Sequence, residues 1–299
     1  MTRVHYFNYL IKIKVNIEDN IALIGDFKNW DDFEDKQIEY LKNKSKKLKL
    51  KSSILLFRKN FLNNGIFNTK NIIKIAKRQK IDNVIIYDYN ENYLNFDQKD
   101  LFNNIVNELS IKKTVIANNY YECKIFNTDF FVNNFSTNNL LFGDFKLKSY
   151  KYNNIQLIKE NKFEEFKINN KLMYMFDGIV EKGKQLGRKI GFPTINIVFN
   201  KDNKLLINHG VYACKVYIEN LDYIFIGAGC YWKNELDQDV FEVNLFDFDK
   251  EIYGWKVTIE PVKWIRNGIK VNSLDELILL LKNDVSFIKL LKINKETYE

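Results

Sequence analysis

The stretch Gly-Arg-Lys-Ile-Gly-Phe-Pro-Thr-Ile-Asn-Ile, residues 187–197, decides how the second half of this chain is interpreted. It contains Pro193, one of two prolines in 299 residues, whereas an average sequence of this length has about fifteen. Proline fixes its own φ and biases Phe192 towards an extended backbone, so a strand is expected to begin here. Thr194 and Asn196 are two apart on that strand and therefore point to the same face.

The face that carries Thr194 and Asn196 is a candidate metal site. A hydroxyl and an amide oxygen are ligands that Mg²⁺ accepts beside nucleotide phosphates. Spacing alone leaves a second interpretation open, in which both are polar strand residues that make local hydrogen bonds.

Glycines and cations crowd together just before this strand. Glycine lets backbone amides approach an anion closely, and lysine or arginine balances phosphate charge. The stretch contains neither a Walker A pattern nor GxGxxG, so a phosphate-binding turn and an ordinary set of turns both stay open. The residues concerned are Gly178, Gly183, Gly187 and Gly191, with Lys182, Lys184, Arg188 and Lys189 among them.

A third element is Phe-Glu-Val-Asn-Leu-Phe-Asp-Phe-Asp, residues 241–249. Alternation places Glu242, Asn244 and Phe246 on one strand face. We expect that face to line a barrel, where the Glu242 carboxylate can accept a proton from an alcohol as a general base. A surface glutamate at the end of a strand is the alternative interpretation.

After about residue 171, strand-like runs follow one another without long helical patterns, which predicts an antiparallel barrel or sandwich. A helix is expected to close the chain as far as Leu291, since Ser273 is a good N-cap and Glu276 follows it by three residues. The expected strands are 174–180, 194–199, 210–218, 223–227, 240–248 and 255–264.

The first half alternates strand-like and helix-like segments, which predicts βαβ units and a parallel sheet. We therefore place a boundary near residue 170 and expect two domains, 1–170 and 171–299. Strands are expected at 21–27, 53–57, 83–87 and 114–117, and helices at 30–51, 68–79 and 97–109.

The formal net charge of +8 is unevenly distributed. From Met173 onward there are 17 Lys and Arg residues against 18 Asp and Glu residues, so the basic excess lies in the first 172 residues. Lysines concentrated at 42–51 indicate either a nucleic-acid or phosphate surface or the solvated face of a helix. We favour the helix face and expect no nucleic-acid partner.

The cysteines and the hydropathy pattern indicate a cytoplasmic protein. Cys123, Cys214 and Cys230 are far apart and form no CxxC pair, which is typical of reduced thiols rather than of disulfides or a zinc site. No apolar run approaches the roughly 18–20 residues that a membrane span needs. Lysines and carboxylates interrupt the apolar residues near Met1, so no signal-peptide pattern is expected there.

Taken together, residues 174–292 resemble the riboflavin kinase module at the C-terminus of bacterial bifunctional riboflavin kinase/FAD synthetases. The matching pieces occur in the family's order, which makes the resemblance specific where each piece alone is weak. One departure is Cys230-Tyr231, where the family has Asn/Gly-Pro at the end of the fourth strand. The pieces are 176–180, 187–197, 210–212, 226–227 with 231–234, 241–254 and 265–266.

The resemblance implies a six-stranded antiparallel barrel with a closing helix, and phosphorylation of the riboflavin 5′-hydroxyl by ATP and Mg²⁺. It implies that Thr194 and Asn196 bind the metal and the ATP phosphates. It further implies that Glu242 is the base and that Arg266 belongs to a mobile segment over the flavin. The nucleotide is expected beneath the turn that contains Gly178, Lys182, Gly183 and Gly187.

The first half resembles the FMN adenylyltransferase domain of the same family, whose signature GxFDGxHxGH binds ATP phosphates through two histidines. In this chain the histidine positions fall on Asp31 and Glu34. His5 and His209 are too far apart to supply the pair. Because carboxylates repel a triphosphate, we expect an α/β nucleotidyltransferase-like domain with a Rossmann-like parallel sheet but without adenylyl transfer.

Three function classes follow from these observations. The favoured class is a riboflavin kinase that makes FMN but no FAD, with riboflavin and ATP as small-molecule substrates. The first alternative is a bifunctional enzyme that also makes FAD, which the missing histidines oppose. The second is a non-catalytic flavin- or RNA-binding protein, which the set of Thr194, Asn196 and Glu242 opposes.

Overall fold

The chain forms two compact units, which are described separately. The N-terminal unit comprises residues 1–62 and 69–151, and the C-terminal unit comprises 63–68 and 152–299. The residues between 152 and 170 thus group with the second unit. The computed structural model describes residues 1–8, 16–25, 27, 29–59, 65–89, 106–117, 132–133, 137–143, 153–200, 204–219 and 221–295.

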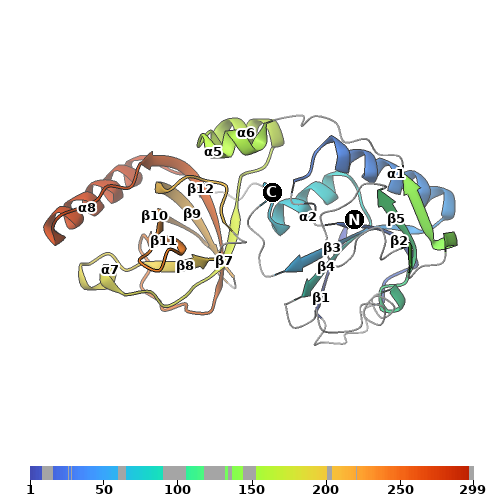
Figure 1. Cartoon of the computed structure of the whole chain (residues 1–299), viewed down its shortest axis with the longest axis horizontal. Helices are drawn as coiled ribbons and strands as arrows, with labels where there is room; N and C mark the ends of the chain where they lie inside the picture. The colour runs from blue at the N-terminus through green and yellow to red at the C-terminus, as the bar shows by residue number, and fades with distance from the viewer. Residues whose placement is uncertain are drawn as a thin grey trace. The chain divides into compact units, whose positions relative to one another are not determined.

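A parallel sheet organises the N-terminal unit (Figure 1). Its strand order is β1-β4-β3-β2-β5-β6, and every neighbouring pair is parallel, which confirms the expected fold class. Strand β2 is buried along its whole length, as strands covered on both faces are. The strands are β1 (Arg3–Asn8), β2 (Asn20–Gly25), β3 (Lys51–Lys59), β4 (Asn83–Tyr89), β5 (Ile111–Ala117) and β6 (Leu140–Gly143).

Helices connect these strands. Helix α1 (Asp32–Leu48) follows β2 and packs on β2 and β3 through an apolar stripe that includes Ile38 and Leu41. Helix α2 (Thr69–Arg78) lies between β3 and β4 in the chain. The lysines near the end of α1 are on its solvent side, while Ile38 and Leu41 are almost fully buried. This arrangement agrees with the solvated helix face that was favoured for the lysine run.

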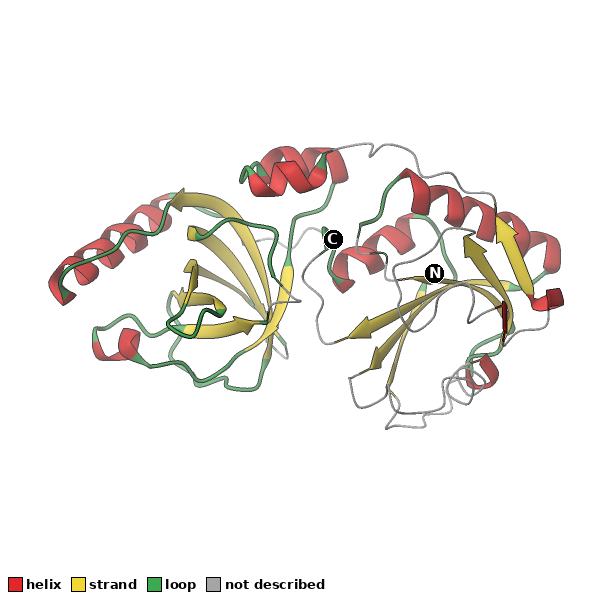
Figure 2. Ribbon diagram, viewed as in Figure 1, coloured by secondary structure: helices red, strands yellow, loops and turns green. Residues whose placement is uncertain are grey.

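The C-terminal unit is a nearly closed antiparallel barrel, which confirms the expected fold (Figures 1 and 2). The strand order is β7-β12-β9-β10-β11-β8. Across the remaining gap, the Glu181 N–H donates to the Asn196 carbonyl over 2.8 Å, so the chain after β7 meets β8. The strands are β7 (Phe176–Ile179), β8 (Ile195–Phe199), β9 (Gly210–Ile218), β10 (Ile224–Lys233), β11 (Asp239–Leu245) and β12 (Lys256–Arg266).

Aromatic rings fill the interior of the barrel. The Phe241 ring lies 5.0 Å from that of Phe176 and 6.2 Å from that of Tyr212, measured between centroids. All three side chains are fully buried. Burying rings of this size supplies a large share of the hydrophobic stabilisation of so small a barrel. The side chains of β11 that alternate with Phe241 must therefore point to the outer face of the barrel.

Two short helices, α5 (Asn154–Lys159) and α6 (Phe163–Asn170), precede the barrel. The Phe166 ring of α6 meets the Tyr174 ring edge to face, with centroids 6.4 Å apart. Phe163 stacks on the same tyrosine at 6.4 Å. Helix α6 therefore belongs to the hydrophobic core of the second unit, and α5 contributes the buried Leu157 and Ile158.

The segment 65–68 comes from the first half of the chain but packs in this unit. The Phe67 ring lies 5.9 Å from that of Phe166, and Phe67 is 4% exposed. Asn68 Nδ2 donates to the buried Asp177 carboxylate over 3.3 Å. The segment thus supplies an apolar contact to α6 and a polar contact to β7.

Helix α8 (Leu274–Leu290) packs on β10. Ser273 caps it, since its hydroxyl accepts the Glu276 N–H over 3.1 Å. The Glu276 carboxylate accepts the N–H of Asn272 rather than that of Ser273, so the expected capping box is displaced by one residue.

Periodicity did not predict the short or edge elements, namely β1, β6, α5, α6 and α7 (Leu186–Lys189). The helix expected at 97–109 lies mostly outside the described residues, although 106–108 are helical. Among the helices that the structure describes, none has the length and apolar character to cross a membrane.

Candidate functional site

One row of cross-strand partners contains three of the predicted site residues, Asn196, Glu242 and Arg266. Asn196 of β8 lies opposite Glu242 of β11, which in turn lies opposite Cys230 of β10. The row continues through Val211 of β9 to Arg266 of β12. Direct partners in an antiparallel pair point to the same face. Asn196 and Glu242 are therefore neighbours, and Arg266 lies three strands away along the same row.

Glu242 is on the outer face of the barrel. Phe241, Val243 and Leu245 are buried towards the aromatic interior, whereas Glu242 and Asn244 are half-buried on the opposite side. The expectation that Glu242 lines the barrel interior is therefore wrong. Alternation along a strand shows which residues share a face, but it does not show which face points into the barrel. The fully buried Phe241 identifies its own face as the interior one, so Glu242 lies on the outer face.

The environment of Glu242 favours a carboxyl that titrates above its usual range. Burial raises the pKa of Glu242 above its ordinary value of 4.5, and a hydrogen bond from Trp232 opposes the rise. Burial, reinforced by repulsion from the Glu242 carboxylate, raises the pKa of the Cys230 thiol to about 12. Glu242 thus lies beside a neutral thiol and an indole N–H, in a partly desolvated position suited to accepting a proton.

Thr194 and Asn196 are adjacent, as their spacing predicts. Asn196 Nδ2 faces the Thr194 hydroxyl at 3.5 Å, a long contact that leaves the pair weakly held. Two glycines cover them. A Cβ on Gly183 would lie 2.8 Å from the Asn196 amide, and one on Gly187 would lie 3.6 Å from the Thr194 hydroxyl. The glycine turn therefore lies directly against the candidate metal ligands.

The other residues of the glycine turn have different surroundings. Gly178 lies inside β7, where a Cβ would come within 2.4 Å of the Ile197 side chain, so the close approach of β7 to β8 requires glycine there. Lys182 is exposed at the start of the turn. Their contacts with a nucleotide stay predictions.

Two cations of the glycine turn are paired with carboxylates. Lys184 Nζ lies 2.5 Å from Glu235, and an Arg188 nitrogen lies 2.7 Å from Glu251. All four side chains are largely exposed, so these contacts hold the turn only weakly.

Arg266 is held by a residue that the sequence did not single out. Its Nε donates to Asp284 Oδ1 over 2.9 Å, and a terminal nitrogen donates to Oδ2 over 2.6 Å. Such a two-point contact fixes the plane of the guanidinium. Asp284 is 6% exposed on α8. A buried acid on an otherwise leucine-rich helix face was the available signal, because such a residue needs a cationic or donor partner.

The carboxylates at the expected histidine positions of the N-terminal unit have structural partners. Asp31 Oδ1 accepts the Asp32 N–H over 2.6 Å, and Glu34 accepts the Asp31 N–H over 2.8 Å. Together they form the capping box at the start of α1. Asp35, one residue further on, accepts the Trp30 indole N–H over 2.9 Å.

Comparison with known proteins identifies relatives of the second half of the chain. Residues 170–291 match the family model described as Flavokinase, riboflavin kinase. The trifunctional protein RibF/MnmA of Mycoplasmoides gallisepticum is 39% identical over 122 residues, which is 38% of this chain but only 18% of that protein. A bifunctional riboflavin kinase/FMN adenylyltransferase of Buchnera aphidicola subsp. Schizaphis graminum is 26% identical over 302 residues, which cover 92% of this chain and 95% of that protein.

Two further similar proteins have names that describe another activity. The RNA-binding riboflavin kinase RibR of Bacillus subtilis is 35% identical over 120 residues, 39% of this chain and 50% of that protein. A crystal structure of a protein named macrolide-efflux protein, from Streptococcus pneumoniae, has a TM-score of 0.52 at 20% identity. It covers 95% of this chain and 98% of its own, and at that identity it supports the two-unit fold alone. Residues 170–291 therefore contain the riboflavin kinase domain that the family model describes.

Proposed function

We propose that the C-terminal unit transfers the γ-phosphate of ATP to the 5′-hydroxyl of riboflavin and so makes FMN. The observation that carries this proposal is the direct cross-strand pairing of Glu242 with Asn196, beneath a turn that contains Gly183. This arrangement sets a proton acceptor beside a candidate phosphate and metal site, which is what phosphorylation of an alcohol requires.

Thr194 and Asn196 fit Mg²⁺ bound together with nucleotide phosphates. Among the described residues, no cluster of His, Cys, Asp and Glu could hold a metal by itself. Mg²⁺ is commonly held by a few protein oxygens, with substrate phosphates and waters completing its shell. The hydroxyl and the amide would supply those oxygens, and the metal would neutralise charge that develops on the phosphates.

Glu242 would act on the riboflavin hydroxyl. As the hydroxyl oxygen forms its bond to the γ-phosphorus, the Glu242 carboxylate accepts the proton, and ADP leaves with the electrons of the broken P–O bond. Burial raises the pKa of Glu242 above its ordinary value, which strengthens the deprotonated carboxylate as a base.

Arg266 would bind the far end of the substrate. It lies three strands from Glu242 in the same row. With strands about 4.8 Å apart, that separation is roughly 14 Å along the sheet. A molecule with a reactive hydroxyl at one end of a flexible chain and a flat ring system at the other can span it, as riboflavin does.

The test uses purified protein with riboflavin, ATP and Mg²⁺, followed by chromatographic separation of flavins. We expect FMN and ADP in equal amounts. Thr194→Val and Asn196→Leu should each weaken Mg²⁺·ATP binding much more than riboflavin binding in calorimetry. If both variants bound Mg²⁺·ATP normally, Thr194 and Asn196 would not be metal ligands.

We propose in addition that the N-terminal unit does not adenylate FMN. The start of a helix attracts phosphate because its free N–H groups and its dipole favour an anion. In this chain Asp31 and Glu34 occupy backbone N–H groups at the start of α1, and the first turn carries three acids. An incoming triphosphate would meet like charge and N–H groups that already have acceptors.

Bifunctional activity is the second candidate, because the Buchnera relative bears that name and its match extends over both units. RNA binding is the third, supported by the name of RibR, and the lysines of α1 would carry it. Formation of FAD in the assay above identifies the second. A salt-sensitive shift of a labelled RNA in a gel identifies the third. The two described cysteines are free, which supports a cytoplasmic location.

A further inference from the structure

A buried side chain from the first half of the chain contacts the barrel of the second unit. Asn68 is 6% exposed and donates a hydrogen from Nδ2 to the Asp177 carboxylate over 3.3 Å. Phe67, the residue before it, is 4% exposed and packs against α6, so the segment 65–68 is fixed at this place. The match to the family model begins at residue 170, so Asn68 lies outside the matched part of the chain.

Asp177 lies on the outer face of β7. Its neighbour Phe176 points into the aromatic interior, so alternation along the strand turns Asp177 away from it. Thr258, the cross-strand partner on β12, donates its hydroxyl hydrogen to the same carboxylate over 2.6 Å. Both side chains are almost inaccessible, and a buried carboxylate needs such donors because it has lost those of water. Asn68 therefore binds β7 from outside the barrel, while Thr258 binds it within the sheet.

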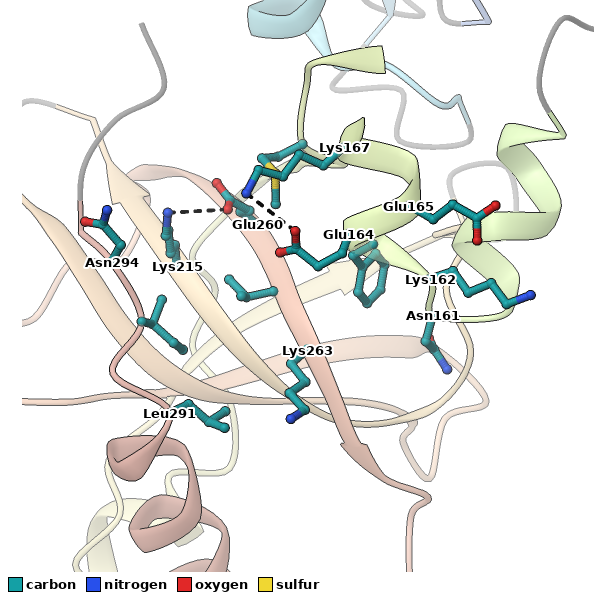
Figure 3. Close-up of a pocket in the computed structure, with 14 residues that line it drawn as sticks. Asn161, Lys162, Glu164, Glu165, Lys167, Lys215, Glu260, Lys263, Leu291 and Asn294 are labelled. Atoms are coloured by element: carbon teal, nitrogen blue, oxygen red, sulfur yellow. Dashed lines mark ion pairs between the residues drawn. The ribbon is translucent and has the colours of Figure 1, made fainter. Parts of the chain in front are cut away.

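A different element lies against the next part of this outer face. Glu260 follows Thr258 by two residues on β12 and therefore shares its face. It pairs with the buried Lys215 of β9 at 3.6 Å (Figure 3). Helix α6 packs on β12, and Figure 3 shows its Lys167 beside this ion pair. Because α6 adjoins the pair, the loss of Asn68 should act on β7 and leave Lys215 and Glu260 in place.

Strand β7 leads directly to a candidate metal ligand. Gly178 follows Asp177 and approaches β8 so closely that a Cβ would meet a side chain there at 2.4 Å. Three residues later the Glu181 N–H donates to the Asn196 carbonyl over 2.8 Å. The glycine turn follows, and a Cβ on Gly183 would lie 2.8 Å from the amide of Asn196. A shift of β7 at Asp177 is therefore passed on to Asn196 and to the turn that covers it.

We propose that Asn68 is a positioning residue for the kinase reaction, which acts through Asp177 and β7 on Asn196 and the glycine turn. This inference rests on the proposed kinase function and adds to it a side chain from the first half of the chain. The path ends at the proposed Mg²⁺·ATP site. Arg266, at the proposed riboflavin site, lies at the opposite end of β12 from Thr258, so the binding of riboflavin should not depend on Asn68.

Removal of the donor tests the proposal in the full-length protein. Asn68→Leu keeps the approximate size of the side chain and deletes the hydrogen bond to Asp177. We expect the KM for Mg²⁺·ATP to rise roughly three- to ten-fold, because one such bond changes an equilibrium by about that factor. The KM for riboflavin should stay unchanged. An unchanged KM for Mg²⁺·ATP would overturn the proposal. If Asn68→Leu does not fold, Asn68→Ala, which introduces no bulk, is tested for the same two outcomes.

Asn154→Leu is the matched control for a loss of stability alone. Asn154 is also a buried asparagine of the second unit, but it exchanges hydrogen bonds with Asn170 of α6, at 3.1 Å and 2.9 Å. Thermal unfolding should show both variants to be less stable than the wild type. Only Asn68→Leu should have a raised KM for Mg²⁺·ATP. An equal rise in both variants would overturn the proposal, because a general loosening of the unit would then explain it.

An exchange of the two partners tests the contact itself. Asn68→Asp combined with Asp177→Asn again places one amide donor against one carboxylate, and the new amide oxygen can accept the Thr258 hydroxyl hydrogen. This double variant should have a KM for Mg²⁺·ATP close to that of the wild type. If the folded double variant instead had the raised KM of Asn68→Leu, the hydrogen bond would play no part and the proposal would be overturned. Wild-type protein that made no FMN would overturn the proposed function and this inference with it, whereas a negative result in an active enzyme overturns the role of Asn68 alone.

Discussion

At the scale of single residues, the partly buried carboxylate of Glu242 dominates the proposed chemistry. Glu242→Gln keeps the shape and removes the basicity. We expect the turnover rate to fall roughly 10²–10⁴-fold, because a positioned general base contributes about that much. Steady-state kinetics with saturating riboflavin and ATP measures it. Near wild-type turnover with unchanged riboflavin affinity would mean that another group accepts the proton.

The pH dependence of the reaction provides a second test of the same carboxyl. A base acts only when it is deprotonated, so kcat/KM should fall as the pH drops through the pKa of Glu242. Because burial raises that pKa, the fall should begin at a higher pH than for a glutamate with the ordinary value of 4.5. Trp232→Phe removes the hydrogen bond that lowers the pKa, so it should move the acidic limb to still higher pH. An acidic limb that is identical in both proteins would show that the group which titrates is not Glu242.

The residue scale also shows what the sequence could and could not predict. Spacing alone placed Thr194 beside Asn196, and the structure has them in contact. The side of the barrel on which Glu242 lies was predicted wrongly, because it depends on which face closes around the aromatic core. The pairing of Arg266 with Asp284 was not predicted, because eighteen positions separate the two and no local period links them.

At the scale of elements, the glycine turn should tolerate a methyl group badly where it faces the metal ligands. Gly183→Ala would bring a Cβ within 2.8 Å of the Asn196 amide. We expect kcat/KM for ATP to fall roughly ten- to a hundred-fold, because small displacements of positioning groups have large effects on rate. Gly268→Ala is the matched control, since a Cβ there meets nothing within 4 Å. If the two variants had equal kinetics, the glycine turn would take no part in nucleotide binding.

Helix α8 contributes to the same site through Asp284. Asp284→Asn should weaken the two-point contact with Arg266, so we expect a higher KM for riboflavin and a stability loss of about 1–3 kcal/mol. Asp275→Asn, at an exposed position in the first turn of α8, should change neither quantity appreciably. Urea unfolding and riboflavin kinetics measure both effects. An unaltered KM would assign to the pair a purely structural role.

The boundaries of helices and strands were predicted best where the hydrophobic pattern was strong. The expected strands at 83–87 and 210–218 correspond to β4 and β9, because each is a continuous apolar or alternating run with turn residues at its ends. The helices α5 and α6 were missed because they are short and α6 has a low amphipathic character. Their place is set by packing on Tyr174, which only the tertiary structure reveals.

At the scale of the whole molecule, we expect FMN and no FAD from riboflavin, ATP and Mg²⁺, however long the incubation. The carboxylates at the start of α1 cannot donate hydrogen bonds to the α-phosphate or to the departing pyrophosphate while they are ionised. Stoichiometric FAD from FMN and ATP would contradict this prediction. The double variant Asp31→His and Glu34→His introduces histidines at the two signature positions and tests whether FAD synthesis is gained. The same variant is expected to destabilise α1, because the capping box is lost.

A division of the chain tests which residues each unit needs. The fragment 152–299 should make FMN, although it lacks Phe67 and Asn68 and so should be less stable than the full second unit. The fragment 172–299 should be less stable still, because it also lacks the rings of Phe163 and Phe166 that cover Tyr174. Thermal unfolding of the two fragments compares them directly. In the full chain, Phe67→Ala should reduce stability by about 3–5 kcal/mol. If the fragment 172–299 were as stable as 152–299, the domain boundary would lie near residue 171, where the sequence pattern changes from alternating helices and strands to consecutive strands.

The segment 65–68 has a consequence for the order in which the protein is made. Phe67 leaves the ribosome early, but the ring that covers it, Phe166, follows 99 positions later. At a synthesis rate of roughly 5–20 residues per second, the delay is on the order of 5–20 s. During that time the nascent chain has finished β3 and β4 on either side of an apolar segment whose partners do not yet exist. Phe67 therefore stays uncovered until the second unit has begun to emerge.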